Sequence, residues 1–375
     1  MSEVSDEHLE YLSLPNRSAK YRQAIQAVLK PEGSVADLGC GVGVLGMFCL
    51  EAGAKAVWGI DKSDAIELAR ESARQAGLSK QYHCIADSTF RAELPDQVDL
   101  IICDHVGFFG FDYGMIEMLD DARRRFLKPG GAVMPQALGL VVAGVSSDAC
   151  AQKAAAWTAE QIPDQFRWLD EHHRNSRHHH SYAQDDFISE PVVLGEITLD
   201  EEVPELFKFQ CTLTMQSDGQ FDGVAGWFDC HLGGGVRMSN SPFAPDSIER
   251  AQAFLPAETS FEVERGDEVG FSLTFRRDLT LTSWTITPPG AHPRQSLSTW
   301  KSKILRPEDL VQRSARAPEL NAQGVARAFI LSKIDGKRLA AEIEDLVLSE
   351  YPDLYPTELA IREFVRHTLA MDCAV

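Results

Sequence analysis

The chain divides into three stretches according to how apolar and polar positions alternate. In the first, residues 34–147, short apolar runs alternate with segments of helical periodicity. Strands separated by helices predict a parallel sheet with right-handed crossovers. We expect strands at 34–38, 56–60, 82–86, 98–103 and 132–134, helices at 44–52, 63–76 and about 115–127, and a turn at 128–131.

The other two stretches have different textures. From about residue 186, short alternating runs are separated by glycine, proline and aspartate, which predicts an antiparallel barrel or sandwich. From about residue 303, helical periodicity returns, and residues 8–30 show it as well, with an interruption near Pro15. The expected C-terminal helices cover 321–334, 337–350 and 356–370.

These textures predict an α/β chain of three domains, and the length of 375 residues has room for them. Residues 1–147 are expected to form a Rossmann-like domain with an N-terminal helix. Residues 148–290 are expected to form an antiparallel β-barrel domain with a polar, partly helical insertion at about 151–185. Residues 291–375 are expected to form a small helical domain.

The net charge and the cysteines indicate which partners and which cellular compartment the protein has. The formal charge of −20 argues against binding of nucleic acid or of an anionic membrane, and no apolar run approaches membrane-spanning length. Eight cysteines are scattered without C-x-x-C spacing, and the acidic N-terminus does not resemble a signal peptide. We therefore expect a cytoplasmic protein with free thiols.

The most informative segment is a glycine-rich turn that follows the first expected strand. Residues 37–43 have the pattern D-L-G-x-G-x-G, and the next strand ends at Asp61. A strand, a glycine turn, a helix and a second strand ending in an acid form a mononucleotide-binding half. Asp37 before the first glycine opposes a pyrophosphate but suits a cation. The pattern resembles motif I of class I S-adenosylmethionine (SAM)-dependent methyltransferases, whose cofactor carries a sulfonium and an ammonium.

The order of further segments resembles the protein arginine methyltransferases over roughly residues 8–290. The matching segments are 35–48, 52–61, 93–102, 188–191, 225–229 and 239–242. This resemblance implies a Rossmann-like class I methyltransferase domain, a β-barrel domain and a dimerisation arm. The arm corresponds to about 151–185 here and implies a homodimer.

The cofactor half of the motif set is intact. Asp37 and the backbone of Gly39 and Gly41 are expected to surround the methionine part of SAM. Arg17 is expected to pair with the SAM carboxylate, the alternative being a solvated helix arginine.

The nucleoside end of the cofactor has three further candidates. Asp61 is expected to accept the ribose hydroxyls, and Lys62 to flank the adenine. Asp87 follows the third strand, where class I enzymes often place an acid that contacts adenine. The alternative for Asp87 is a helix cap together with Ser88.

The acceptor half departs from the family pattern. The family holds a guanidinium with two glutamates; here the first aligns with Asp104 and the second with Tyr113, with Asp112 one position earlier. We take Asp104, His105, Asp112 and Tyr113 as catalytic candidates, with His105 the group best suited to act as a base near neutral pH. The family's Thr-His-Trp loop falls on 247–249, where Glu249 is a further candidate contact. The family's N-terminal helix would lie before Met1, so we expect no such cap over the cofactor.

Several functions remain open on this basis. The leading hypothesis is SAM-dependent N-methylation of a small amine or guanidine compound such as free arginine, or of a biosynthetic peptide. The alternatives are O-methylation in natural-product biosynthesis and a catalytically inactive scaffold that binds a peptide. The histidines at 172–180 lack metal-site spacing, so we expect a solvated loop and no metal site.

Residues 316–370 weakly resemble the small winged-helix domain of PQQ-biosynthesis peptide chaperones. The resemblance rests on short segments such as Leu320-Asn321, Ile334-Asp335-Gly336 and Tyr351-Pro352. It implies that this segment binds a leader peptide. The alternative is a helical cap or a dimer element.

Overall fold

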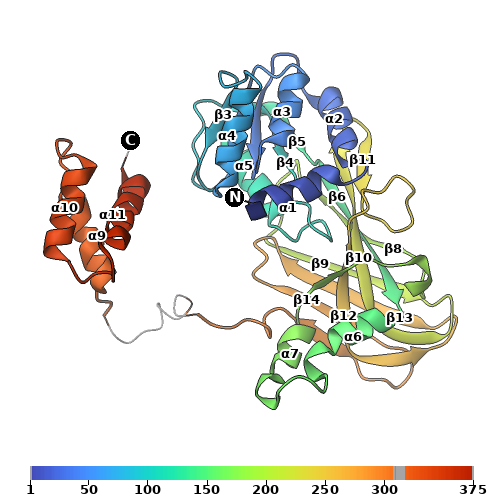
Figure 1. Ribbon diagram of the computed structural model, residues 1–375. Helices are drawn as coiled ribbons and strands as arrows, with labels where there is room; N and C mark the ends of the chain where they lie inside the picture. The colour runs from blue at the N-terminus through green and yellow to red at the C-terminus, as the bar shows by residue number, and fades with distance from the viewer. Residues whose placement is uncertain (1, 307–308, 310–316, 374–375) are drawn as a thin grey trace. The chain divides into compact units, whose positions relative to one another are not determined.

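The computed structural model describes residues 2–306, 309 and 317–373 (Figure 1). The chain forms two compact units, residues 1–303 and 304–375, and each is described by itself. Residue 316, the first of the segment compared with peptide chaperones, lies outside the described residues, as do residues 307–308, 310–315 and 374–375 of the predicted C-terminal domain.

The first unit begins with a five-stranded parallel sheet in the order β3-β2-β1-β4-β5. The strands are β1 (Ser34–Leu38), β2 (Ala56–Ile60), β3 (Tyr82–Ile85), β4 (Val98–Cys103) and β5 (Leu127–Met134). The strand order reverses between β1 and β4, and open α/β sheets bind ligands beyond the carboxyl ends of strands at such a point. The parallel sheet predicted from the sequence is confirmed.

Helices connect these strands as the sequence predicts. They are α3 (Val44–Glu51), α4 (Ala65–Gln75) and α5 (Met115–Phe126). The predicted turn at 128–131 is wrong, because β5 starts at Leu127 directly after α5. Gly130, at φ 73°, lies where the pairing with β4 shifts register, so the glycine absorbs a bulge within the strand rather than ending it.

Two helices precede the sheet, separated at the predicted break. They are α1 (Ser2–Ser13) and α2 (Arg17–Val28). Asn16 just before α2 has a left-handed φ of 61°, which turns the chain between them. Tyr21, Ala24 and Ile25 of α2 are fully buried in the core. This packing fixes Arg17 and Tyr21 near the end of β4.

The antiparallel strands form two sheets. One has the order β7-β12-β10-β6-β8, with β11 also paired to β10, and the other has the order β15-β14-β13-β9. The strands are β6 (Ala137–Val145), β7 (His178–His180), β8 (Val192–Thr198), β9 (Leu206–Thr214), β10 (Gly219–Gly233), β11 (Val236–Ser239), β12 (Gln252–Val263), β13 (Glu268–Arg276), β14 (Thr282–Thr287) and β15 (Gln295–Ser298).

The predicted antiparallel region is therefore present, but the described strands do not close into one barrel. Strands β8 and β9, at the sheet ends, meet through side chains: a Cβ on Gly195 would lie 2.3 Å from the Phe209 ring. The predicted domain boundaries at residues 147 and 290 also do not coincide with the limits of the antiparallel sheets. Strand β6 lies before the predicted boundary at 147 yet pairs with β10 and β8, and β15 lies beyond residue 290 yet pairs with β14.

The parallel and antiparallel parts share one hydrophobic core. The segment after β4 contributes two fully buried rings to it, Phe109 and Phe111. Phe111 stacks on Phe275 of β13 with ring centroids 4.0 Å apart, and Phe109 covers Gly226 of β10. The site at the end of β4 is consequently built on a rigid support.

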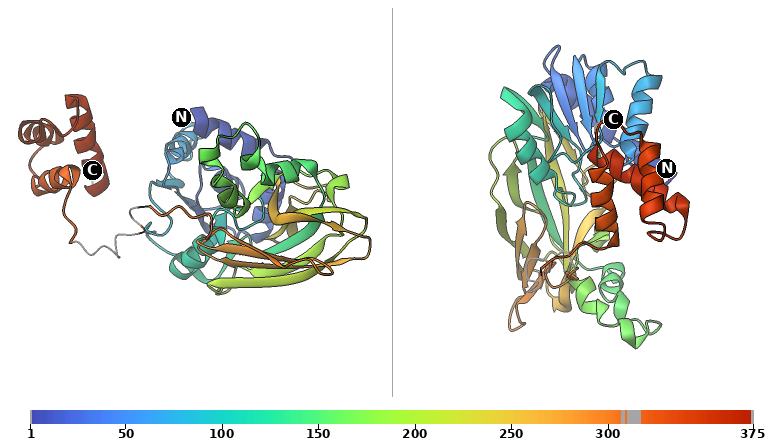
Figure 2. Two further views of the ribbon diagram at one scale, coloured as in Figure 1. Left: turned by 90° about the horizontal axis from the view of Figure 1, so that it is seen from below. Right: turned by 90° about the vertical axis from the view of Figure 1, so that its left-hand side faces the viewer.

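The segment expected as an arm contains short helices. Helix α6 (Asp148–Ala154) and helix α7 (Leu169–Arg174) project from one end of the antiparallel region, with two 3-10 turns between them (Figures 1 and 2). Strand β7 returns the chain by pairing with β12. Phe166 and Trp168 of this segment are more than half exposed, at 51% and 59%.

The second unit contains α9 (Ala322–Ser332), α10 (Ala340–Glu350) and α11 (Glu358–Asp372) around a small core. Buried Glu344 pairs with Arg362 and Arg366, which ties α10 to α11. The helical prediction is confirmed, but residues 317–373 contain no strand, so the wing of a winged helix is absent from this range. In the described part of the chain, no helix is both long and apolar enough to cross a membrane.

Candidate functional site

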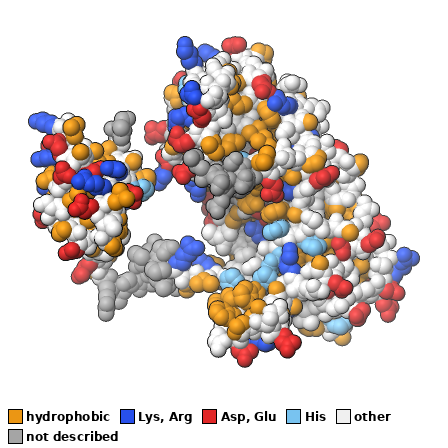
Figure 3. Space-filling model, viewed as in Figure 1, with side chains coloured by type: hydrophobic (Ala, Val, Ile, Leu, Met, Phe, Trp, Pro, Cys, Tyr) orange, Lys and Arg blue, Asp and Glu red, His pale blue; other side chains and the backbone are white. Residues whose placement is uncertain are grey.

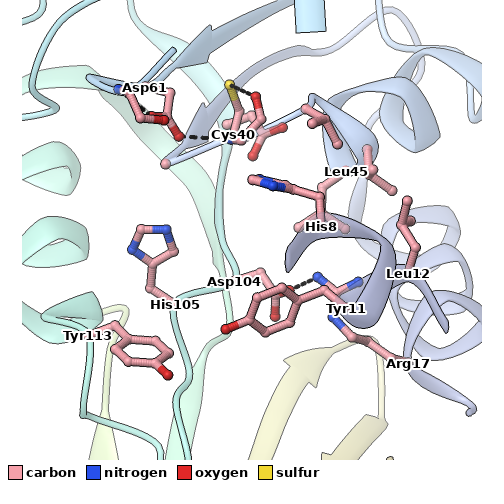
Figure 4. A pocket seen from close by; sticks show the side chains of 16 residues that line it. His8, Tyr11, Leu12, Arg17, Cys40, Leu45, Asp61, Asp104, His105 and Tyr113 are labelled. Atoms are coloured by element: carbon pink, nitrogen blue, oxygen red, sulfur yellow. Dashed lines mark hydrogen bonds and ion pairs between the residues drawn. The ribbon is translucent and has the colours of Figure 1, made fainter. Parts of the chain in front are cut away.

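A cavity of about 410 Å³ lies beyond the carboxyl ends of β1 and β4, at the reversal of strand order (Figure 4). This volume is in the range of small-molecule sites. The residues that line the cavity come from α1, the start of α2, the end of β1, the glycine-rich turn, the start of α3, the segment after β2 and the segment after β4. They are His8, Tyr11, Leu12, Arg17, Asp37, Gly39, Cys40, Gly41, Val42, Val44, Leu45, Asp61, Ser63, Asp104, His105 and Tyr113.

The glycine-rich turn lines the cavity, and its glycines leave room there. Gly39 and Gly41 have φ values of 61° and 54°, in the left-handed region that favours glycine. A Cβ on Gly39 would lie 2.4 Å from the ring of His105, and one on Gly41 would lie 2.3 Å from the ring of His8. The turn is therefore a cradle that a side chain would fill, with an imidazole on each side.

Asp37 lies at the end of β1, beneath this turn, and is only 2% exposed. One carboxylate oxygen, Oδ2, accepts the Gly46 N–H at 2.9 Å. Burial raises the pKa of Asp37 to about 7, although the Gly46 hydrogen bond opposes the shift. A buried carboxylate at the cavity wall favours a cationic ligand, because a cation stabilises its ionised form.

Asp61 lies at the end of β2, as predicted, and faces the cavity. Its Oδ2 accepts the Gly41 N–H at 2.9 Å, while Oδ1 accepts the Ser63 N–H at 2.8 Å and the Ser63 hydroxyl at 2.6 Å. These contacts fix the carboxylate between the glycine turn and the start of α4.

The other two nucleoside-end candidates do not line this cavity. Lys62 is exposed. Asp87 accepts the Ser88 N–H at 2.6 Å and pairs with Arg91 at 2.7 Å, and these contacts lower its pKa. The local capping alternative for Asp87 therefore matches its contacts in this structure.

The structure brings together a predicted cofactor residue and a predicted acceptor residue. Arg17 forms an ion pair with Asp104 (Figure 4). The Tyr21 hydroxyl donates a hydrogen bond to the same carboxylate. Arg17 is 7% exposed, and burial lowers its pKa. Asp104 thus has both oxygens engaged, yet it remains on the cavity wall.

The loop after β4 separates the two candidates for the second acceptor contact. Tyr113 lines the cavity, whereas Asp112 does not. Asp112 Oδ2 accepts the N–H groups of Phe108 and Phe109 at 2.8 Å and 2.6 Å, and Oδ1 pairs with Arg177 at 2.8 Å. Asp112 therefore holds the loop in shape, and its carboxylate is not directed to the cavity as a second acidic contact.

His105 lines the cavity beside Gly39. Burial lowers its pKa, and the Asp61 charge opposes the shift. The imidazole is consequently neutral at pH 7 and able to take a proton.

A helix covers the cavity, so the expectation of a missing cap is wrong. His8, Tyr11 and Leu12 of α1 point into the cavity from the side opposite His105 and Tyr113 (Figure 4). Their spacing of three and four residues places them on one helix face. This spacing is the signal in the sequence for the cap. His8 and Tyr11 are not predicted from the resemblance, because the family's own helix is rich in tyrosine.

Sequence reasoning also missed Arg250. Its guanidinium lies over three rings, 4.8 Å from the centroid of Tyr11, 4.9 Å from Phe108 and 5.7 Å from Tyr113. It donates to the Tyr11 hydroxyl at 3.0 Å. The only signal in the sequence was its position directly after the segment aligned with Thr-His-Trp.

Comparisons with known proteins agree with this geometry. The methyltransferase domain family matches residues 35–131, which contain the glycine-rich turn, Asp37 and Asp61. The protein is a SAM-dependent methyltransferase. Protein arginine N-methyltransferase 2 of Xenopus tropicalis is 27% identical over 307 residues, covering 74% of this chain and 70% of that protein. A probable protein arginine N-methyltransferase 6 of Arabidopsis thaliana is 36% identical over 143 residues, covering 37% of this chain and 32% of that protein.

Solved structures show the same fold around the methyltransferase core. The Trypanosoma brucei PRMT1 enzyme–prozyme heterotetrameric complex with AdoHcy matches with a TM-score of 0.69 and 23% identity, covering 78% of this chain and 97% of that one. Arabidopsis thaliana protein arginine methyltransferase 10 matches with a TM-score of 0.65 and 18% identity, covering 77% and 96%. At these identities the likeness concerns the fold.

The methyltransferase has a further cavity of about 310 Å³, and Tyr113 lines both this cavity and the first one. It is lined by Phe108, Asp112, Tyr113, Ser176, Arg177, His178, His179 and Thr299. Residues 178–180 of the predicted histidine loop form strand β7. The ring of His179 stacks on that of Phe108, with the ring centroids 4.8 Å apart. The described residues hold no group of three or more His, Cys, Asp or Glu side chains placed to bind a metal ion.

Proposed function

We propose that the enzyme transfers a methyl group from SAM to a nitrogen of a guanidine or amine compound, with Asp104 as its acidic contact to the acceptor. The observation that carries this proposal is the position of Asp104 on the wall of the cavity that also contains the glycine turn. The resemblance to arginine N-methyltransferases over 74% of the chain supports a nitrogen acceptor.

The cavity residues fit the charges and hydroxyls of SAM. Asp37 offers a buried carboxylate to the cationic methionine end, and Arg17 offers a guanidinium to the carboxylate. Asp61 is held at the end of β2, where it accepts ribose hydroxyls. Lys62 at the adenine and Asp87 beside it remain predictions of the sequence.

Arg17 has two partners in this scheme. In the structure it neutralises Asp104. When it turns to the cofactor carboxylate, Asp104 regains an open oxygen and a net negative charge. Acceptor binding therefore follows cofactor binding, and a cationic acceptor takes the place that Arg17 leaves.

The chemistry requires alignment and the loss of a proton. Bound SAM supplies a methyl group on sulfonium sulfur, which the acceptor nitrogen lone pair attacks as the carbon–sulfur bond breaks, leaving a neutral thioether. Asp104 orients the acceptor, so that much of the rate comes from positioning. His105, neutral and beside the cavity, takes the proton that the nitrogen loses.

The test is label transfer from methyl-labelled SAM to arginine, to agmatine and to an arginine-containing peptide. We expect labelled small guanidine product, with Asp104→Asn about 10- to 100-fold slower. Asp121→Asn is the matched control, since Asp121 also pairs with an arginine but lies outside the cavity. The proposal is rejected if no label appears on a guanidine or amine nitrogen of these compounds. It is also rejected if Asp104→Asn transfers the label at the original rate.

O-methylation is the second candidate. It is favoured by a neutral His105 in the cavity together with Tyr113, because this pair can accept a proton from a hydroxyl and orient its oxygen. Label on an oxygen of a natural-product precursor, with no label on nitrogen, would select this function.

Two partner proposals accompany the enzyme. We propose a homodimer through the arm at about 151–185, where hydrophobic side chains including Phe166 and Trp168 gather on the surface (Figure 3). Light scattering should show a dimer that Trp168→Asp converts to a monomer.

We also propose that residues 316–370 bind a leader peptide of a biosynthetic substrate. We further propose that the enzyme works in the cytoplasm, where its free cysteines remain reduced.

A further inference from the structure

We propose that Arg250 recognises a carboxylate on the acceptor, so that the substrate is a guanidino or amino acid rather than a simple amine. This inference rests on the proposed function for the nitrogen end of the acceptor. It concerns the other end of the molecule, where the sequence resemblance assigns nothing.

The first observation is how Arg250 is held. Three aromatic rings surround its guanidinium, and all three centroids lie within the 6 Å range of cation–π contacts. Two tyrosine hydroxyls, those of Tyr11 and Tyr113, accept from its Nη2 at 3.0 Å and 3.5 Å. The planar group is thus held in a fixed orientation, with Nη2 donating to both hydroxyls, and a carboxylate that binds here would be met by Nε or Nη1.

The second observation is charge. Among the described residues, no carboxylate forms an ion pair with Arg250, although its guanidinium is close enough for its charge to lower the pKa of Arg17. Two arginines therefore share this region with one ion-paired carboxylate, Asp104. Once Arg17 pairs with the cofactor and Asp104 with the acceptor nitrogen, Arg250 is the cation that still lacks an anion.

The third observation is the position of Arg250 beside the two cavities. Tyr11 and Tyr113 line the cofactor cavity, and Phe108 and Tyr113 line the second cavity. Arg250 is not itself among the residues that line either cavity, but it contacts all three of these rings, and Tyr113 lines both cavities. A substrate with its nitrogen at Asp104 would bring the rest of its chain past Arg250.

The experiment measures binding of four probes to the full-length enzyme loaded with S-adenosylhomocysteine, by ligand-detected NMR. Arginine carries both groups, agmatine is arginine without its carboxylate, valerate has the carboxylate alone, and butyl phosphate carries a different oxyanion. In Arg250→Gln, arginine and valerate should bind about tenfold more weakly while agmatine changes less than twofold. Arg250→Lys, which keeps the charge without the fork, should fall between the two. Arg70→Gln, an exposed arginine on α4, is the matched control and should change nothing.

The outcomes separate this inference from the proposed function. If valerate binds through Arg250 but agmatine does not bind, the carboxylate site stands and the guanidine acceptor fails. If arginine and agmatine bind equally, and Arg250→Gln affects neither, the inference is overturned while the guanidine acceptor survives. Tighter binding of butyl phosphate than of valerate, or an equal loss of cofactor affinity in Arg250→Gln, would also overturn it.

Discussion

Single residues decide what the two ends of this cavity bind. Under the proposed function, Asp37 and Asp61 present carboxylates to the cofactor, and Asp104, which pairs with Arg17, is the carboxylate of this cavity that contacts the acceptor. Asp112, which the sequence predicted as a second acidic contact, instead accepts hydrogen bonds from two backbone N–H groups of its own loop. An acceptor with a single acidic contact needs a second anchor, and Arg250 is placed to provide it.

Asp37 should make the cofactor-free enzyme less stable as pH rises. Its folded pKa of about 7 lies above the usual value of 3.8, so the folded state holds a proton that the unfolded state has lost between these pH values. The free energy of unfolding should therefore fall as pH rises from 4 to 7, by at most about 4 kcal/mol. Urea denaturation at pH 5 and pH 8 measures this change.

Asp37→Asn supplies the comparison, because the amide cannot ionise. The variant should lose most of this pH dependence, match the original protein near pH 5 and exceed its stability at pH 8, while binding SAM more weakly. An identical pH dependence in both proteins would show that Asp37 is not the group responsible.

At the scale of elements, the site is assembled from one helix and one loop around the strand ends. Helix α1 covers the cavity, and Asp104, His105 and Tyr113 of the loop after β4 line it as well. The loop is anchored at two levels. Phe109 and Phe111 are buried in the core beneath it, and Asp112 bonds its backbone from within.

Asp112→Ala should loosen this loop. It removes the acceptor of two backbone N–H groups and the partner of Arg177, which should lower the free energy of unfolding by about 2 kcal/mol. Hydrogen exchange at the Phe108 and Phe109 amides should become faster, and acceptor turnover should fall more than cofactor affinity. Unchanged exchange at these two amides would disprove the anchoring role.

Deleting residues 2–13 should weaken SAM binding by about tenfold or more, because the cavity loses the wall formed by His8, Tyr11 and Leu12. Calorimetric titration gives the affinity. Leu9→Ala, a change on the exposed side of the same helix, is the control and should bind SAM normally. Equal affinity of the deletion variant and the intact protein would mean that α1 is no part of the cofactor site.

At the scale of the whole molecule, the chemistry belongs to one of two compact units. The cavity, the glycine turn and both antiparallel sheets lie within residues 1–303, whereas residues 304–375 have their own small core. A chain ending at Lys303 should therefore fold and bind SAM with an affinity within about threefold of the full chain. Loss of SAM binding on truncation would show that the second unit contributes to the site.

The sequence predicted that the glycine turn and its two acids lie together, for a physical reason. A glycine turn between a strand and a helix, with acids at fixed positions, is local in the chain, so spacing alone places Asp37, Gly39, Gly41 and Asp61 together. Helices and parallel strands follow from periodicity in the same way. The turn expected at 128–131 failed because Gly130 supports a bulge in a strand as well as a turn.

The acceptor side depends on contacts between distant segments, which spacing does not encode. Arg17 and Asp104, which form an ion pair, lie 87 residues apart in the chain. The rings that surround Arg250 come from α1 and from the loop after β4, whereas Arg250 itself lies just before β12. Whether antiparallel strands close into a barrel is likewise set by side-chain packing, as at Gly195 and Phe209. These features became visible only in three dimensions.

The most direct test of the account is arginine binding to the cofactor-free enzyme and to the enzyme loaded with S-adenosylhomocysteine, measured by calorimetry. If Arg17 leaves Asp104 for the cofactor carboxylate, arginine should bind the loaded enzyme at least about tenfold more tightly, and Asp104→Asn should remove that difference. Equal binding of arginine with and without the cofactor would contradict the shared role of Arg17, and with it the assignment of Asp104 as the acceptor contact.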